Sequence, residues 1–168
     1  MPPRIRSATA LDLEAMAAMK DAAWRETYPG LVPDAVLAGL DARRPRVVER
    51  WGRELRDGAS YWVAVDEGGI VGVTHACVAP EPPRGVPLEL AMLYLLERVK
   101  GTGLGQALLH TAIGDADAHL WVLEGNRRAI AFYTRNGFIP DGAAKDVPGM
   151  PGGVREIRMV RCAEPDEA

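Results

Sequence analysis

The most informative part of the sequence reads Glu89-Leu90-Ala91-Met92-Leu93-Tyr94-Leu95 and, after four more residues, Lys100-Gly101-Thr102-Gly103-Leu104-Gly105. Its first half is almost entirely apolar, as expected for a central strand that is covered on both faces. Its second half alternates glycine with other residues, and Leu104 and Leu108 then recur at helical spacing. The stretch therefore predicts a buried strand, a tight glycine turn and the N-terminus of a helix.

Glycines at the start of a helix suit an anionic ligand. Glycine allows a sharp turn and a close approach to the backbone, and a helix N-terminus offers unpaired N–H donors at the positive end of the helix dipole. From spacing alone, a tight turn without any ligand remains the alternative. Two familiar phosphate loops do not fit, because Lys100 precedes Gly101 instead of following the glycines, and because the dinucleotide fingerprint needs a small residue where Gln106 or Leu108 stands.

The flanking segments predict one α/β domain with a mixed sheet. Upstream we expect a short strand at residues 5–8 and helical segments at 9–28, 34–40 and 43–57. A hairpin follows, with strands at 61–65 and 70–80. Downstream we expect a buried strand at residues 120–123 and a helix at 126–136, capped by Asn126 and ended by Gly137. Two final strands are expected at 138–140 and 154–160. Thr9 and Asp12 resemble a capping box for the first helix.

Length and charge exclude several classes of protein. The chain has 168 residues and a net charge of −3, so we expect a single domain over residues 1–162, a short acidic and frayed tail over 163–168, and no nucleic-acid partner. No apolar run is long enough to cross a membrane and no secretory signal is visible, so we expect a cytoplasmic protein without a membrane partner. The arginines between Arg43 and Arg56 predict a solvated helix face, with an anionic partner as the alternative.

The cysteines and histidines do not suggest a metal site. Cys77 and Cys162 lie in strand-like runs, and we expect both to be reduced thiols in the core. Neither has the spacing of a metal ligand, and the three histidines are scattered along the chain. We therefore expect no zinc or other metal.

The strand and glycine turn closely resemble the acyl-CoA binding motif of the GNAT superfamily of N-acetyltransferases, [QR]xxGx[GA] at the start of a helix. Residues 126–138, Asn-Arg-Arg-Ala-Ile-Ala-Phe-Tyr-Thr-Arg-Asn-Gly-Phe, resemble the second motif of that family, NxxAxxFYxxxGF. The resemblance extends loosely over nearly the whole chain and implies a mixed, mostly antiparallel sheet of about six to seven strands with helices on both faces. Two positions depart from the pattern, because Lys100 replaces the usual Arg or Gln and Glu97 stands where many members have proline.

The resemblance implies transfer of an acetyl group from acetyl-CoA to a primary amine in a ternary complex, without a metal. Tyr133 matches the position that protonates the departing thiolate; a half-buried structural aromatic is the alternative. Asn126 caps the helix and is also expected to touch the pantetheine. The residues expected to bind CoA through the pantetheine or the phosphates are Leu93, Tyr94, Leu95, Lys100, Gly101, Thr102, Gly103, Leu104, Gly105, Gln106, Asn126 and Tyr133.

The base that deprotonates the amine is not set by the resemblance. Glu89 is our candidate, acting directly or through water, with a surface role as the alternative; His75 is a weaker candidate. The acceptor is a small-molecule or peptide amine, and the family places its pocket after Tyr28 and in the loop 80–87. A homodimer is compatible with the sequence. Two other functions stay open, a non-catalytic CoA-binding or regulatory module and, less favoured, an enzyme acting on a nucleotide phosphate.

Overall fold

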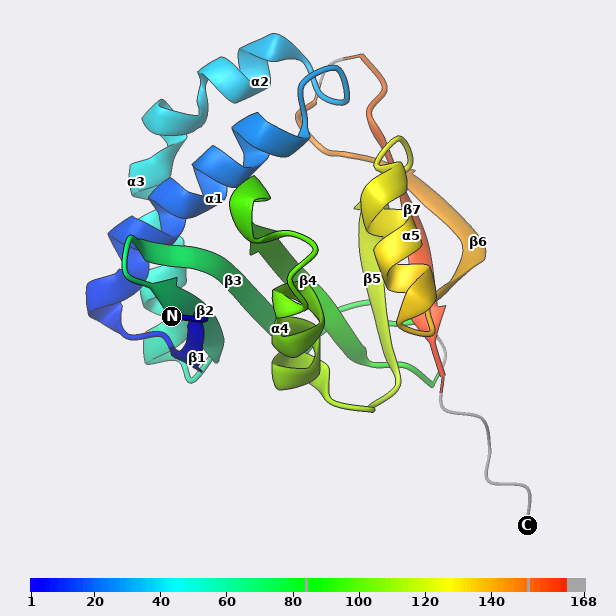
Figure 1. Ribbon diagram of the computed structural model, residues 1–168. Helices are drawn as coiled ribbons and strands as arrows, with labels where there is room; N and C mark the ends of the chain where they lie inside the picture. The colour runs from blue at the N-terminus through cyan, green and yellow to red at the C-terminus, as the bar shows by residue number, and fades with distance from the viewer. Residues whose placement is uncertain (84, 151, 163–168) are drawn as a thin grey trace.

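The computed structural model describes residues 1–83, 85–150 and 152–162 and is built around one seven-stranded sheet in the order β1-β2-β3-β4-β5-β7-β6 (Figure 1). The strands are β1 Arg4–Ser7, β2 Tyr61–Asp66, β3 Gly69–Val78, β4 Leu88–Leu95, β5 Ala118–Leu123, β6 Ile139–Asp146 and β7 Arg155–Arg161. The helices are α1 Leu13–Thr27, α2 Asp34–Ala38, α3 Leu40–Arg56, α4 Leu104–Ile113 and α5 Arg127–Arg135, with short 3-10 turns η1 Ala10–Asp12 and η2 Glu97–Val99. The expected mixed sheet with helices on both faces is confirmed.

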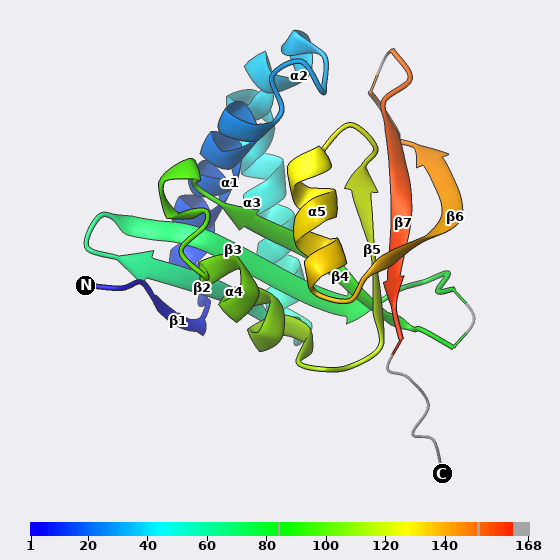
Figure 2. The same cartoon turned by 45° about the vertical axis from the view of Figure 1, so that its right-hand side comes forward.

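Helices cover the two faces of the sheet in separate layers. In Figure 2, α1 and α3 lie behind the sheet, whereas α4 and α5 lie in front of it. On the first face, Met16 and Trp51 pack in one buried cluster with Val73 and Met92 of the sheet. On the other face, Leu109 of α4 and Tyr133 of α5 share a cluster with Leu90, Leu120 and Met159. Each helix is thus held by an apolar stripe facing the sheet.

The strands β4 and β5 form the one parallel pair among the described strands, and they soon separate. Their register contains a single pair, Glu89 with His119, and Figure 1 shows the two strands diverging beyond it. Within β4, Leu90 pairs with Ala76 and Met92 with His75, so Ala91 is an extra residue, a β-bulge. The backbone of β4 beyond the bulge therefore has a partner strand on its β3 side and a gap on its β5 side.

Most expected elements are present, but several bounds differ. The third helix begins at Leu40, not near Arg43, because buried Leu40 anchors its first turn, and it accommodates Pro45. The strand expected at 138–140 extends to Asp146 as β6; it tolerates Pro140 because it is an edge strand with an irregular register there. At the first helix, the Thr9 N–H donates to the Asp12 carboxylate at 2.8 Å, as the capping box predicts, although a 3-10 turn comes first.

The expectation that both cysteines belong to the core is wrong for Cys162. Cys77 is half-buried on β3, whereas Cys162 is exposed just after β7, because the strand ends at Arg161; both are free thiols. The expected tail over 163–168 lies outside the described residues. No helix in the described part of the chain is long and apolar enough to cross a membrane.

Candidate active site

The glycine turn has the backbone geometry of an anion site. Gly101 and Gly103 have φ values of +80° and +88°, in the left-handed region that favours glycine. A Cβ atom on either would meet no atom within 4 Å, so the turn faces open space. The N–H groups of residues 101–106 donate no hydrogen bond to any described residue. Donors without partners, at the positive end of α4, are what a phosphate group requires.

Gly105 serves a different purpose. A Cβ atom there would lie 3.1 Å from Leu95 Cδ1 and 3.3 Å from Phe132 Cε2. The missing side chain therefore lets α4 approach both β4 and α5 closely, and it brings the two expected CoA-binding motifs together.

Residues of β4 and β5 on the two sides of the gap between these strands line a cavity of about 680 Å³. It brings together most of the residues that the sequence singled out, from strand, turn and α5: Glu89, Leu93, Tyr94, Leu95, Lys100, Gly101, Gly103, Gly105, Gln106, Asn126 and Tyr133. Two expected residues do not line it. Thr102 donates its hydroxyl to the Val99 carbonyl at 2.7 Å, and Leu104 is buried under the turn beside Leu108.

Tyr133 is held by aromatic neighbours at the cavity wall. Its ring is buried, and its centroid lies 5.2 Å from that of Phe132 and 5.8 Å from that of Phe138, both nearly edge-on. Burial raises the pKa of the phenol well above its ordinary value, so the hydroxyl keeps its proton at neutral pH. Tyr133 is thus placed as a hydrogen-bond donor within the cavity.

Asn126 caps α5 as predicted. Its Oδ1 accepts the N–H of Ala129 at 3.1 Å, and its side chain is almost fully buried. Capping uses only the side-chain oxygen. The amide Nδ2 can therefore donate hydrogen bonds within the cavity that Asn126 lines.

Glu89 lies where β4 and β5 are still paired, at the end of the gap between the two strands. Its Oε2 is 3.5 Å from Nε2 of buried His119, whose Nδ1 is 3.0 Å from the Val86 carbonyl oxygen. A carbonyl oxygen only accepts hydrogen bonds, so Nδ1 carries a proton and Nε2 faces the carboxylate. His75 is placed elsewhere: it bonds to the Ser60 carbonyl oxygen and stacks on Tyr61.

Glu156 is a cavity residue that sequence reasoning missed. It lies on β7, pairs with Leu123 of β5, and lines the same cavity as Glu89. Burial raises the pKa of its carboxyl; Lys145, with Nζ 3.9 Å away, lowers it, and the charge of Glu89 raises it. No local pattern could relate Glu156 to Glu89, because only the pairing of the strands brings them to one cavity.

A second cavity of about 490 Å³ adjoins the first on the face covered by α1 and α3. The two share Trp24, Tyr94 and three other residues. Its α3 wall is formed at helical spacing by Leu40, Arg43, Val47, Arg50, Trp51 and Glu54, so the expected solvated arginine face is partly directed into a cavity. Neither cavity is lined by residues 80–83 or 85–87, where the acceptor pocket was expected in part.

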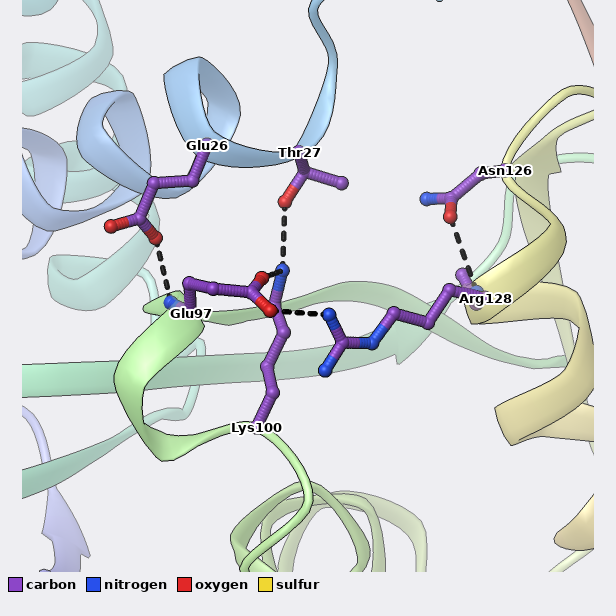
Figure 3. A network of polar contacts seen from close by, with 7 residues as sticks. Glu26, Thr27, Glu97, Lys100, Asn126 and Arg128 are labelled. Atoms are coloured by element: carbon purple, nitrogen blue, oxygen red, sulfur yellow. Dashed lines mark hydrogen bonds and ion pairs between the residues drawn. The ribbon is translucent and has the colours of Figure 1, made fainter.

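A polar network lies beside the first cavity, which Thr27, Lys100 and Arg128 line (Figure 3). The Glu97 carboxylate accepts from Lys100 Nζ at 2.9 Å and from the Arg128 guanidinium on α5. Lys100 Nζ also donates to the Thr27 hydroxyl at 3.0 Å, and the Glu97 N–H donates to Glu26 at 2.6 Å. The network ties the loop after β4 to the end of α1 on one side and to α5 on the other.

Comparison with known proteins agrees with this geometry. The profile of the acetyltransferase (GNAT) domain matches residues 57–140. A probable N-acetyltransferase of Mycobacterium tuberculosis is 31% identical over 96% of both chains. The PaiA N-acetyltransferase of Thermoplasma acidophilum, solved with coenzyme A, has a similar fold, with a TM-score of 0.69 over 96% of this chain and 99% of its own at 18% identity. A Corynebacterium glutamicum structure described as histone acetyltransferase HPA2 and related acetyltransferase is 26% identical, with a TM-score of 0.68 over 99% of each chain. The chain therefore belongs to the GNAT family of N-acetyltransferases.

Proposed function

We propose that this protein transfers the acetyl group of acetyl-CoA to a primary amine by direct attack, with both substrates bound at once. One observation carries the proposal: the unpaired N–H groups of the glycine turn, Glu89 and Tyr133 all belong to the cavity in the gap between β4 and β5. A phosphate site, a carboxylate and a phenol along one cavity are what this reaction needs.

The described residues fit the donor substrate. The N–H groups of Gly101, Gly103 and the first turn of α4 would bind the pyrophosphate, since they have no other partner. The edge of β4 at Leu93–Leu95 faces the gap and would pair with the pantetheine amides as an added strand. A thioester held there supplies the acetyl group, and a β4 N–H next to the bulge would polarise its carbonyl.

The side chains around the gap would handle the protons. Glu89 accepts a proton from the acceptor ammonium, directly or through water, which frees the nitrogen lone pair for attack. The new C–N bond forms as the C–S bond breaks, and Tyr133 donates a hydrogen bond and then its proton to the departing sulfur. The attacking nitrogen then gives up its second proton, which returns through water to the Tyr133 phenolate, so the products are a neutral amide and free CoA thiol. Because the two substrates lie in adjoining spaces, much of the rate enhancement comes from orientation.

The acceptor would enter through the second cavity. That cavity adjoins the first at Trp24 and Tyr94, and it reaches β4 on the face opposite to α4 and α5. A small-molecule amine or the end of a peptide would fit between α3 and the sheet. Arg43 and Arg50 offer contacts to an anionic part of the acceptor and Glu54 to a cationic part.

The direct test is release of free CoA thiol from acetyl-CoA in the presence of a panel of primary amines, with the acetylated product verified by mass. We expect thiol release that depends on one class of amine. Tight CoA binding without release across small amines and peptide N-termini would instead support a non-catalytic CoA-binding module. Preferential stabilisation by ATP or NAD would contradict the choice of donor.

A further inference from the structure

Lys100 and Arg128 both line the phosphate end of the cavity, and neither is free in this structure. One carboxylate, that of Glu97, binds both cations, with Lys100 on Oε2 and Arg128 on Oε1 (Figure 3). The neighbouring Arg98 is directed away, because its guanidinium pairs with Asp66. A side-chain anion therefore pairs with two cations that line the same cavity as the glycine turn.

The contacts of Glu97 are of the kind that a phosphate can replace. The exposed fraction of the side chain is 50% for Glu97 and 61% for Arg128, and an ion pair between two exposed groups is weak. Lys100 is only 16% exposed, but it keeps a second partner in Thr27 when Glu97 leaves. A phosphate carries more charge and more acceptor oxygens than a carboxylate, so it binds the same cations more strongly. Hydrogen bonds from Lys100 and Arg128 lower the pKa of the Glu97 carboxyl, so it competes as an anion at every physiological pH.

The surroundings hold the rest of the network in place. The Thr27 hydroxyl holds Lys100 Nζ from α1, and Glu26 holds the backbone N–H of Glu97. The side chain of Glu97 can therefore leave without displacing the loop or Lys100. Only the carboxylate has to be exchanged.

We propose that Glu97 is an internal competitor of the coenzyme: its carboxylate occupies Lys100 and Arg128 in the free protein, and a phosphate group of CoA displaces it. The inference rests on the proposed CoA-dependent function and adds to it a residue that lowers coenzyme affinity. It also gives a role to the residue at which this chain departs from the proline of the family pattern.

The test compares Glu97→Gln with Glu26→Gln by calorimetric titration with CoA, pyrophosphate and pantetheine. Both variants remove one negative charge from the network, but only Glu97 contacts the two cations. We expect Glu97→Gln to lower the Kd for CoA about three- to tenfold and to lower the Kd for pyrophosphate as well. Glu26→Gln should change the Kd less than about twofold, and pantetheine, which lacks phosphate, should bind both variants like the parent protein.

Salt gives an independent readout. The advantage of Glu97→Gln should narrow as the salt concentration rises from about 0.05 to 0.5 M, because screening weakens the competition. Weaker CoA binding by Glu97→Gln would overturn the inference, because Glu97 would then position the two cations for CoA. Unchanged CoA binding would also overturn it, because Glu97 would then not compete with CoA. Failure of all three proteins to bind CoA would instead contradict the proposed function.

Discussion

At the residue scale, Tyr133 has a ring that is buried among aromatic side chains and that also lines the cavity. Tyr133→Phe removes only the hydroxyl, so the aromatic contacts to Phe132 and Phe138 persist. Loss of the proton donor should lower kcat by about 10²-fold or more, whereas the Kd for CoA should change less than about twofold. Steady-state rates and calorimetry on the same preparation measure the two quantities. Full activity of the variant would remove Tyr133 from the mechanism.

Glu89 and His75 make a second prediction at this scale, because both were candidates for the base. Glu89 lies beside His119 where β4 and β5 are still paired, whereas His75 lines the second cavity against Tyr61. Glu89→Gln should lower kcat about 10²-fold without weakening CoA binding. His75→Gln should affect mainly the KM of the amine. The reverse pattern in a full kinetic analysis would identify His75 as the base.

At the element scale, two glycines of one turn have separable roles. Gly103→Asp places a charged side chain in open space before α4, so CoA binding should be lost while the fold survives with some backbone strain at φ +88°. Gly105→Val forces a side chain against Leu95 and Phe132 and should cost about 1–3 kcal/mol of stability. Thermal unfolding and CoA titration of both variants distinguish the roles. Normal CoA affinity in Gly103→Asp would refute the phosphate assignment.

Local sequence patterns predicted some features of the elements correctly and missed others. The cap at Asn126 and the left-handed Gly137 follow from short-range hydrogen bonds and φ preferences, and the structure confirms both. The length of β6 did not follow, because Pro140 and Gly142 are typical of a turn, and only pairing with β7 makes the segment an edge strand.

At the scale of the whole molecule, stability should depend on the Asp12 carboxylate. Two hydrogen bonds from Arg6 of β1, with those from Thr9, lower the pKa of Asp12 well below its ordinary value. A pKa lower in the folded state than in the unfolded state stabilises the fold above the unfolded pKa, near 4, and this stabilisation disappears as the pH falls. Asp12→Asn should therefore cost about 1–2 kcal/mol at pH 7.

That cost should shrink as the pH falls from about 5 to 2, because the carboxyl is protonated first in the unfolded state, where its pKa is higher. Urea unfolding of both proteins across this range measures it. A difference in unfolding free energy that stays constant with pH would show that the charge of Asp12 is not involved.

Residues that are close along the chain were enough to predict the glycine turn and its open N–H groups, the cap of α5, and the order of strands and helices along the sequence. Three features depend on the packing of distant segments and could not be predicted: the gap between β4 and β5, the placement of Glu156 with Glu89, and the contact of Glu97 with Arg128. The reason is physical. A backbone turn is set by φ preferences and bonds within a few residues, whereas a cavity is set by where strands from distant parts of the chain pair and where they separate.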